Sequence, residues 1–532
     1  MHPLQVPEIL SNVLLFADRQ TLAAAARVNS LWADVATDAC YFRPHFSIEG
    51  VQHSDIRQWL WRGDSILRTL VGWTTLALAN IAKCSEARMA WYLRKIHLVD
   101  LHLVGELHPD LESLMEEKKL DFPNARSMTV FAWDGYLQET EFEQLLSSKL
   151  VCLDLTGATI ESPSILRFIK EHVPMLRSFD FRLYSEQNLT TGELLDFLEG
   201  MPAITHLEAD IDPQLISEEL VQHLALRPNL ELLSFEYSNI CEPVFAYKTL
   251  FSGTIRRPIF QAMRCLNIHL SIPPNSPVPI TGLPKLDNLQ SIKLRLDSTP
   301  YVGSIIGSLA SCPLLEDIII LVDEVVRIQG EILLHIARSC PRVRGFRLDF
   351  YIQGYDDELN DHFIDEMLSC WPALTDFFLY PNPEAAVSFT PAIFESFARY
   401  CPRLTHLKFL LDLDFERLMN APDEIKFPCL HFFTINEIRL RGPVPEPNSD
   451  DFEPTARRFT KLLADRFPVL KSFTHSGNSP FTPKESRPAL WRIGLEFLED
   501  RDVPTPMFTT AGVELRKRLI EPAPGSRFNP CS

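Results

Sequence analysis

The sequence predicts an α/β solenoid, in which helix–turn–strand units stack with parallel strands on a concave face, preceded by a small module of three helices. The first observation is a spacing of apolar residues, three and then two positions apart, that recurs from Leu98 to Phe473. Successive starts lie 25 to 33 residues apart, with a last interval of 40. The second observation is that the first 42 residues lack this spacing. They therefore form a separate module.

Each repeat is expected to contain a helix, a proline turn and a short strand, as residues 330–350 illustrate. The apolar residues of the first half fall at helical spacing, which gives this half one apolar face. Pro341 ends the helix because the residue before a proline is pushed out of the α region. Phe346, Leu348 and Phe350 then alternate with charged residues, the period of a half-buried strand. Neither element can bury its apolar side alone, so neighbouring units must stack.

We divide the chain where this pattern begins, breaks and ends. The divisions are a helical module at 1–42, a helical connector at 43–94, the solenoid at 95–475, a C-terminal helical cap at 476–520 and a flexible tail at 521–532. Two proline-rich stretches, 272–284 and 442–454, are predicted to be loops on the rim of the solenoid.

Composition and charge exclude several classes of function. With 46% hydrophobic and 23% charged residues, the chain is globular. Its net charge of -19 opposes binding to nucleic acid and to anionic membranes. No apolar run is long enough to span a bilayer, and no signal-peptide pattern is evident. We therefore expect a cytoplasmic or nuclear protein with no nucleic-acid or membrane partner.

The cysteines follow the repeat rather than a metal or disulfide pattern. No two of the 11 cysteines form a CxxC pair. We expect reduced thiols that serve as small buried hydrophobes at one structural position. Five of them recur once per repeat: Cys312, Cys340, Cys370, Cys401 and Cys429.

We find no constellation that carries catalysis. The phosphate-binding, nucleophile-elbow, zinc-protease and kinase motifs are all missing from the sequence. Carboxylate pairs such as Asp210 with Asp212 are expected to be solvated, and the spacing of His97, His102 and His108 does not suit a compact metal site. The sequence thus predicts no catalytic residue, no metal and no cofactor, and so not an enzyme.

Residues 1–42 predict three short amphipathic helices. Pro7 falls near the start of the first, where its missing N–H is harmless. Asp18 and Ser30 can cap the second and third. The stretches VPEIL from Val6, DRQTL and ARVNSLW then resemble an F-box, most closely those of the large F-box families of fungi. The repeats resemble the irregular leucine-rich repeats of F-box proteins.

This resemblance implies that the module binds a Skp-type adaptor and, through it, a cullin ubiquitin ligase. The apolar contacts that it implies, or their immediate support, are Val6, Pro7, Ile9, Leu10, Val13, Leu22, Val28 and Trp32. The alternative is that the module is a helical cap that seals the first repeat.

A partner site is expected on the concave face, to which the residues between the buried strand positions point. These residues are acidic in the first repeats, basic at the centre and apolar later. Apolar anchors flanked by charges often dominate interfaces, which suggests where a partner binds. The residues that we expect to hold it are Lys293, Arg295, Ile319, Phe378, Tyr380 and Leu410. Alternatively, a loop or the C-terminal helices cover Ile319 and Phe378.

Together these features predict the substrate-recognition subunit of a Skp–cullin–F-box type ubiquitin ligase. The first module would bind the adaptor, and the repeats would bind a protein substrate whose identity the sequence does not give. The alternative is a scaffold that binds proteins without ubiquitin transfer. An enzyme with an unrecognised site is the least favoured interpretation.

Overall fold

The computed structural model describes the repeat region and a few residues of the N-terminal module. The described residues are 98–104, 122–137, 146–160, 163–183, 189–236, 259–270, 283–296, 301–325, 329–351, 360–381, 390, 392–414, 425–439, 465–470 and 472–475, with Leu10, Thr21, Ala24, Ala25, Val28, Leu31 and Trp32. The predictions for 43–94, 476–520, 521–532, 442–454 and most of 1–42 fall outside them.

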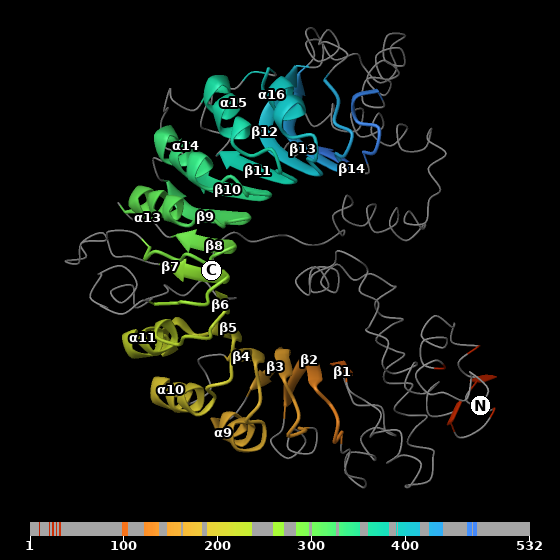
Figure 1. Cartoon of the computed structure of the whole chain (residues 1–532), viewed down its shortest axis with the longest axis vertical. Helices are drawn as coiled ribbons and strands as arrows, with labels where there is room; N and C mark the ends of the chain where they lie inside the picture. Colours follow the sequence, from red (N-terminus) through yellow and green to blue (C-terminus); the bar gives the residue numbers. More distant parts are fainter. Residues whose placement is uncertain are drawn as a thin grey trace, which may run out of the picture. The chain divides into compact units, whose positions relative to one another are not determined.

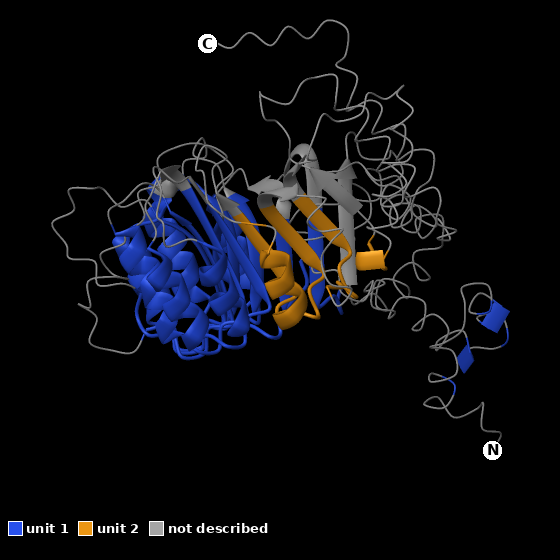
Figure 2. Ribbon diagram, turned by 90° about the horizontal axis from the view of Figure 1, so that it is seen from above, with its two compact units in different colours: residues 1–373, 381–387 blue, residues 374–380, 388–532 orange. Residues whose placement is uncertain are grey.

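The chain divides into two compact units, shown in different colours in Figure 2. Unit 1 consists of residues 1–373 and 381–387, and unit 2 of residues 374–380 and 388–532.

Ten described strands of unit 1 form one parallel sheet in which the strands lie in chain order. This is the arrangement that the three-then-two spacing predicts, and it is confirmed here. The strands are β1 (Leu98–Val104), β2 (Ser127–Leu137), β3 (Cys152–Ile160), β4 (Ser178–Leu183), β5 (His206–Ile211), β6 (Leu232–Glu236), β7 (Cys265–Leu270), β8 (Ser291–Leu296), β9 (Asp317–Val325) and β10 (Gly345–Tyr351).

The described helices of unit 1 lie along one face of this sheet (Figure 1). We call the opposite face, on which none of the described helices lies, the open face. The helices are α9 (Pro163–His172), α10 (Thr191–Gly200), α11 (Glu218–Ala225), α13 (Val302–Ser308), α14 (Gly330–Ser339) and α15 (Asp361–Ser369), with 3-10 turns η2 (Pro213–Leu215) and η3 (Leu309–Ser311).

Unit 2 repeats the same plan. Its described elements are the parallel strands β11 (Asp376–Pro381), β12 (His406–Asp414), β13 (Phe432–Arg439) and β14 (Ser472–His475), and helix α16 (Ile393–Tyr400). The rings of Phe377 on β11 and Phe397 on α16 have centroids 5.0 Å apart, edge to face. This contact joins the helix to the buried side of the strand, because both rings are buried.

The spacing of apolar residues reflects how each repeat enters its strand. Leu153 and Leu155 lie on β3, two residues apart, and so point to the same side of the sheet. Leu150 lies in the turn before the strand and joins them in the core, and all three side chains are fully buried. One apolar residue of each triplet therefore fixes the turn, and the other two fix the strand.

Neighbouring turns are tied by a repeated pair of hydrogen bonds. The carbonyl oxygen of Val151 accepts the N–H groups of Arg177, at 2.8 Å, and Ser178, at 3.0 Å. One repeat later, the carbonyl oxygen of Arg177 accepts those of Thr205, at 2.8 Å, and His206, at 2.9 Å. The hydrogen-bond ladder of the parallel sheet thus continues from the strands into the turns that precede them. It gives hydrogen-bond partners to backbone groups that would otherwise be buried without one.

The residue before the turn proline links successive repeats through a buried donor. The thiol of Cys340 lies 3.4 Å from the carbonyl oxygen of Cys312, the residue at the same position one repeat earlier. The indole N–H of Trp371 donates to the carbonyl oxygen of Cys340 at 3.1 Å. Arg227 occupies the same position and donates to the carbonyl oxygens of Leu198, at 3.1 Å, and Met201 at the end of α10. Each of these carbonyl oxygens also accepts a backbone N–H, so the side-chain donors add a second hydrogen bond where a helix ends.

The prediction that five cysteines share one structural position is only partly right. Cys312, Cys340 and Cys401 precede the turn proline and are buried. Cys370 is displaced by Trp371, which takes the buried position, and Cys429 follows the proline instead of preceding it. Both of these cysteines are half-buried, because their positions in the turn lie outside the core.

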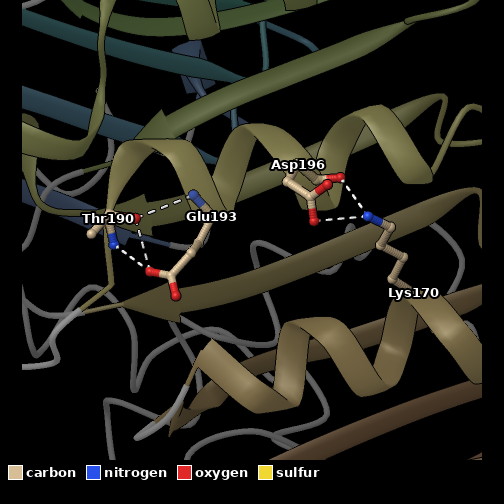
Figure 3. Close-up of polar contacts among 4 residues, drawn as sticks. All are labelled: Lys170, Thr190, Glu193 and Asp196. Carbon is tan, nitrogen blue, oxygen red and sulfur yellow. Dashed lines mark hydrogen bonds and ion pairs between the residues drawn. The ribbon is translucent and has the colours of Figure 1, made fainter.

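Side-chain contacts also connect α9 to α10 (Figure 3). Thr190 caps α10 by accepting the N–H of Glu193, while the Glu193 carboxylate accepts the backbone N–H of Thr190 at 2.9 Å. The ammonium group of Lys170, at the end of α9, donates to the Asp196 carboxylate at 2.8 Å and to the backbone carbonyl oxygen of Asp196 at 3.1 Å. The reciprocal cap holds the start of α10, and the lysine holds its middle against the preceding helix.

Candidate protein-binding face

The register of the sheet arranges one residue from each strand into a continuous line on the open face. Each of these residues lies between the two buried residues of its strand and therefore points to the opposite face. Register pairing joins them one strand at a time from β3 to β10. We call this line the charged row, and its members are Asp154, Asp180, Glu208, Ser234, Asn267, Lys293, Ile319 and Arg347.

The β3–β5 end of the charged row consists of carboxylates. Asp154, Asp180 and Glu208 lie side by side on adjacent strands, which are about 4.8 Å apart in a sheet. Asp180 is only 8% exposed, whereas its two neighbours are half-buried. In the next line of the same face, the Arg182 guanidinium lies 2.9 Å from the Asp210 carboxylate. Four acidic side chains and one basic side chain therefore leave this end of the face with a net charge of -3.

Neutral residues separate this acidic end from the basic part of the row. The side-chain amide of Asn267 donates to the Ser234 hydroxyl at 2.8 Å, which joins β6 to β7. Lys293 follows on β8, with Arg295 two residues further along the same strand and on the same face. Lys293 is half-buried and Arg295 is exposed.

The row ends with an apolar and a basic residue. Ile319 on β9 is half-buried and pairs in register with both Lys293 and Arg347. The Arg347 guanidinium is 47% exposed and lies 3.5 Å from the Asp349 carboxylate on its own strand. Along the row from β3 to β10, there are therefore three acidic residues, two neutral polar residues, one basic residue, one apolar residue and one basic residue.

Two thiols on the open face have raised pKa values. Burial raises the pKa of Cys152 above its ordinary value of 9.0, and the charges of Asp154 and Asp180 raise it further, although hydrogen bonds to two serines oppose them. Burial likewise raises the pKa of Cys265, with a smaller contribution from Glu208. Both thiols stay protonated near neutral pH and are therefore poor nucleophiles.

The structure divides the predicted partner-binding residues between the two units. Lys293 and Ile319 are paired in register on β8 and β9 of unit 1, with Arg295 beside them. In unit 2, Phe378 on β11 is half-buried and pairs in register with Lys408 on β12. The side chains of Tyr380 and Leu410 lie outside the described residues, although their backbones belong to the same two strands.

One cluster on the face of unit 2 was missed by the sequence reasoning. The His406 ring lies 2.5 Å from the Asp376 carboxylate and 2.9 Å from the Thr405 hydroxyl. The same ring stacks on Phe432, with centroids 4.7 Å apart, and Phe432 is 43% exposed. These residues start their strands, two positions before the line that contains Phe378. Extending the alternation by one step toward the N-terminus would have found them.

Only three of the predicted adaptor-binding residues are described. Leu10 is fully buried, Trp32 is half-buried and Val28 is 58% exposed. The remaining five, Val6, Pro7, Ile9, Val13 and Leu22, lie outside the described residues. Of the three, Val28 is the side chain most accessible to a partner.

The described part of the chain contains neither a metal-binding cluster nor a membrane-spanning helix. It contains no group of three or more His, Cys, Asp or Glu side chains placed to hold a metal ion. Among its helices, none combines the length and apolar character needed to cross a membrane.

The repeating register and the turns define the class of this protein as a leucine-rich-repeat-like α/β solenoid. No protein-family model and no curated protein matches the chain. Among solved structures, it is similar to a leucine-rich-repeat protein of Leptospira interrogans, with 14% sequence identity and a TM-score of 0.35. The match covers 74% of this chain and 81% of that one.

Proposed function

We propose that this chain is a substrate-recognition subunit of a Skp–cullin–F-box type ubiquitin ligase. The observation that carries the proposal is the combination, in one chain, of an F-box-like segment with a repeat array whose open face displays ordered lines of polar and apolar side chains. The subunit has no catalytic role of its own. It binds the adaptor at one end and holds a protein substrate on the open face, in the cytoplasm or the nucleus.

Physical chemistry supports protein binding by the open face. A parallel sheet usually has helices on both sides, but none of the described helices covers this face of unit 1 (Figure 1). Its side chains are charged, neutral polar or half-buried apolar residues at a regular spacing, which suits a long partner surface. Such extended faces are the usual binding surfaces of repeat proteins.

Adaptor binding can be tested with a substitution that leaves the core intact. Val28 is 58% exposed, so Val28→Glu places a charge at the surface without opening a cavity. We expect this variant to lose binding to a purified Skp-type adaptor, measured by co-purification and by calorimetry. The matched control is Met175→Glu, because Met175 is 55% exposed in a turn of the repeats. The control should bind the adaptor like the wild-type chain.

A second measurement separates the two candidate functions. The full chain, the adaptor and a cullin are mixed and separated by size-exclusion chromatography. Co-elution of all three supports the ligase subunit, whereas failure of the wild-type chain to bind the adaptor, or equal binding by the Val28→Glu variant, contradicts it. A wild-type chain that binds partner proteins but does not bind the adaptor would favour the alternative, a scaffold without ubiquitin transfer.

A further inference from the structure

The charged row has its charges sorted by sign along the sheet, and this order restricts what can bind to it. Its acidic members occupy β3–β5 and its basic members β8 and β10. From Asp154 to Arg347 there are seven steps between strands, or about 34 Å at about 4.8 Å per step. A single ion or small molecule is too short to contact both ends. The acidic end also repels the phosphates of nucleic acid.

The geometry of the row favours an extended polypeptide that crosses the strands. Three strand steps separate Glu208 from Lys293, a distance of about 14 Å. An extended chain advances about 3.3 Å per residue, so about four residues cover this neutral interval. Lys293 and Arg347 lie two steps apart, about 10 Å, with Ile319 between them. Two acidic residues about three positions apart, with apolar residues between them, match this part.

The carboxylates themselves favour a basic ligand. Like charges opposite one another on neighbouring strands repel, and Asp180 lies between Asp154 and Glu208. A Lys or Arg side chain placed over this group reduces the repulsion and adds charge-assisted hydrogen bonds. At the other end, Lys293 attracts a carboxylate in the same way, and so does Arg347, whose guanidinium is 47% exposed although it also contacts Asp349.

We propose that the charged row binds an extended segment of a partner protein with a basic cluster, a spacer of about four residues, and an acidic pair that encloses apolar residues. This inference rests on the proposed function only in assuming that the open face binds protein. It adds the charge pattern of the segment and the side chains that recognise it.

The test uses the full chain and two fluorescein-labelled peptides of identical composition. The matched peptide is KRKGSGSDLLD, and the control peptide, KDLGRSGKLSD, has its charges interleaved. A peptide can bind in either direction, so an interleaved control is more informative than a reversed one. By fluorescence anisotropy in about 50 mM salt, the matched peptide should bind at least about fivefold more tightly. In about 500 mM salt, the difference should shrink, because salt screens exposed charges.

Substitutions then assign the effect to the row. Asp154→Asn with Glu208→Gln, or Lys293→Gln with Arg347→Gln, should each weaken binding of the matched peptide by about fivefold. Two control pairs change the net charge equally on exposed residues that are not on the open face. They are Glu218→Gln with Glu219→Gln on α11, and Arg342→Gln with Arg403→Gln in the turns. The control pairs should leave the affinity within about twofold of the wild type.

A charge exchange distinguishes contact from a general change in charge. Lys293→Glu should weaken binding of the matched peptide and improve binding of a peptide with both aspartates replaced by lysine. The inference is overturned if the two original peptides bind equally, or if the control pairs weaken binding as much as the row pairs. Neither result bears on adaptor binding through Val28, so failure here and failure of the proposed ligase role are separate outcomes.

Discussion

Trp371 donates its indole N–H to the carbonyl oxygen of Cys340, 3.1 Å away, and the centroids of the Trp371 and Phe346 rings lie 4.9 Å apart. Trp371 is fully buried, so this one side chain fills the core and also adds a hydrogen bond to a backbone carbonyl of the preceding repeat. The position before the turn proline is therefore a joint between repeats.

Substitution of Trp371 should separate these two roles. Trp371→Phe keeps an aromatic ring but removes the donor, and we expect the free energy of unfolding to fall by about 1 kcal/mol. Trp371→Ala also leaves a cavity and should cost about 3–5 kcal/mol. Urea unfolding followed by circular dichroism measures both. Equal losses in the two variants would show that the hydrogen bond, and not the packing, dominates.

Loss of the cap on α10 should destabilise unit 1 by a small amount. Thr190→Ala removes the side chain that accepts the Glu193 N–H and should lower the free energy of unfolding by about 1 kcal/mol. Thr190→Ser keeps the hydroxyl and serves as the control, with a loss well below that of alanine. Thermal unfolding of the three proteins at neutral pH provides the measurement.

The same cap should give stability a dependence on acid. Hydrogen bonds from the backbone N–H and then the hydroxyl of Thr190 lower the pKa of Glu193 below its ordinary value of 4.5. The ionised carboxylate is thus favoured in the folded chain, and its stabilising effect is present above pH 4.5 and lost as the pH falls through the lowered pKa. The stability difference between wild type and Glu193→Gln should therefore shrink in acid. A difference that does not change with pH would contradict this role of the carboxylate.

The cysteines should differ in reactivity according to their place in the turn. Burial raises the pKa of Cys340 and Cys401 to about 12, so these thiols stay protonated in the folded chain. Iodoacetamide at about pH 8 should label them much more slowly than the half-buried Cys370 and Cys429. Mass spectrometry of tryptic peptides measures the rates, and the urea-unfolded chain provides the reference in which all four react alike.

Partner binding should depend on the residues that the sequence singled out. Phe378→Ala and Lys293→Ala each truncate a half-buried side chain on a strand of the repeats, so the fold should persist. We expect each variant to retain less of the partner proteins captured by the wild-type chain, quantified by mass spectrometry. Arg342→Ala, on an exposed turn residue, is the control. Unchanged capture by both test variants would contradict the assignment of these residues.

The sequence predicted the charged row because alternation along a strand is a rigid rule. Once Ile292 and Leu294 are recognised as buried, Lys293 must point to the other face, and the repeat carries this inference from strand to strand. The cluster of His406 and Phe432 was not predicted because these residues precede the first buried residue of each strand, outside the interval that the spacing defines. Leu321 on β9, which pairs in register with Arg295 and therefore lies on the open face, was not predicted because β9 is longer than the spacing indicates.

The division of the cysteines shows where pattern reasoning fails. In one repeat, Cys340 stands directly before the proline, and in the next, Trp371 intervenes between Cys370 and the proline. The turn is positioned by the proline and by the buried apolar residue two positions after it, not by the distance from the previous cysteine. A shift of one residue therefore moves Cys370 out of the core while the overall period hardly changes.

The same pair of backbone hydrogen bonds joins each turn to the next, so one repeat can in principle follow another that is not its present neighbour. Deleting residues 177–204 would join Leu176 directly to Thr205, which occupies the same place in its turn as Arg177. The carbonyl oxygen of Val151 could then accept the N–H groups of Thr205 and His206 as it now accepts those of Arg177 and Ser178. The array could thus be shortened by one unit while its sheet stays continuous. Such a deletion would bring Asp154 next to Glu208. It would also shorten, by the width of one strand, the partner segment that fits along the charged row.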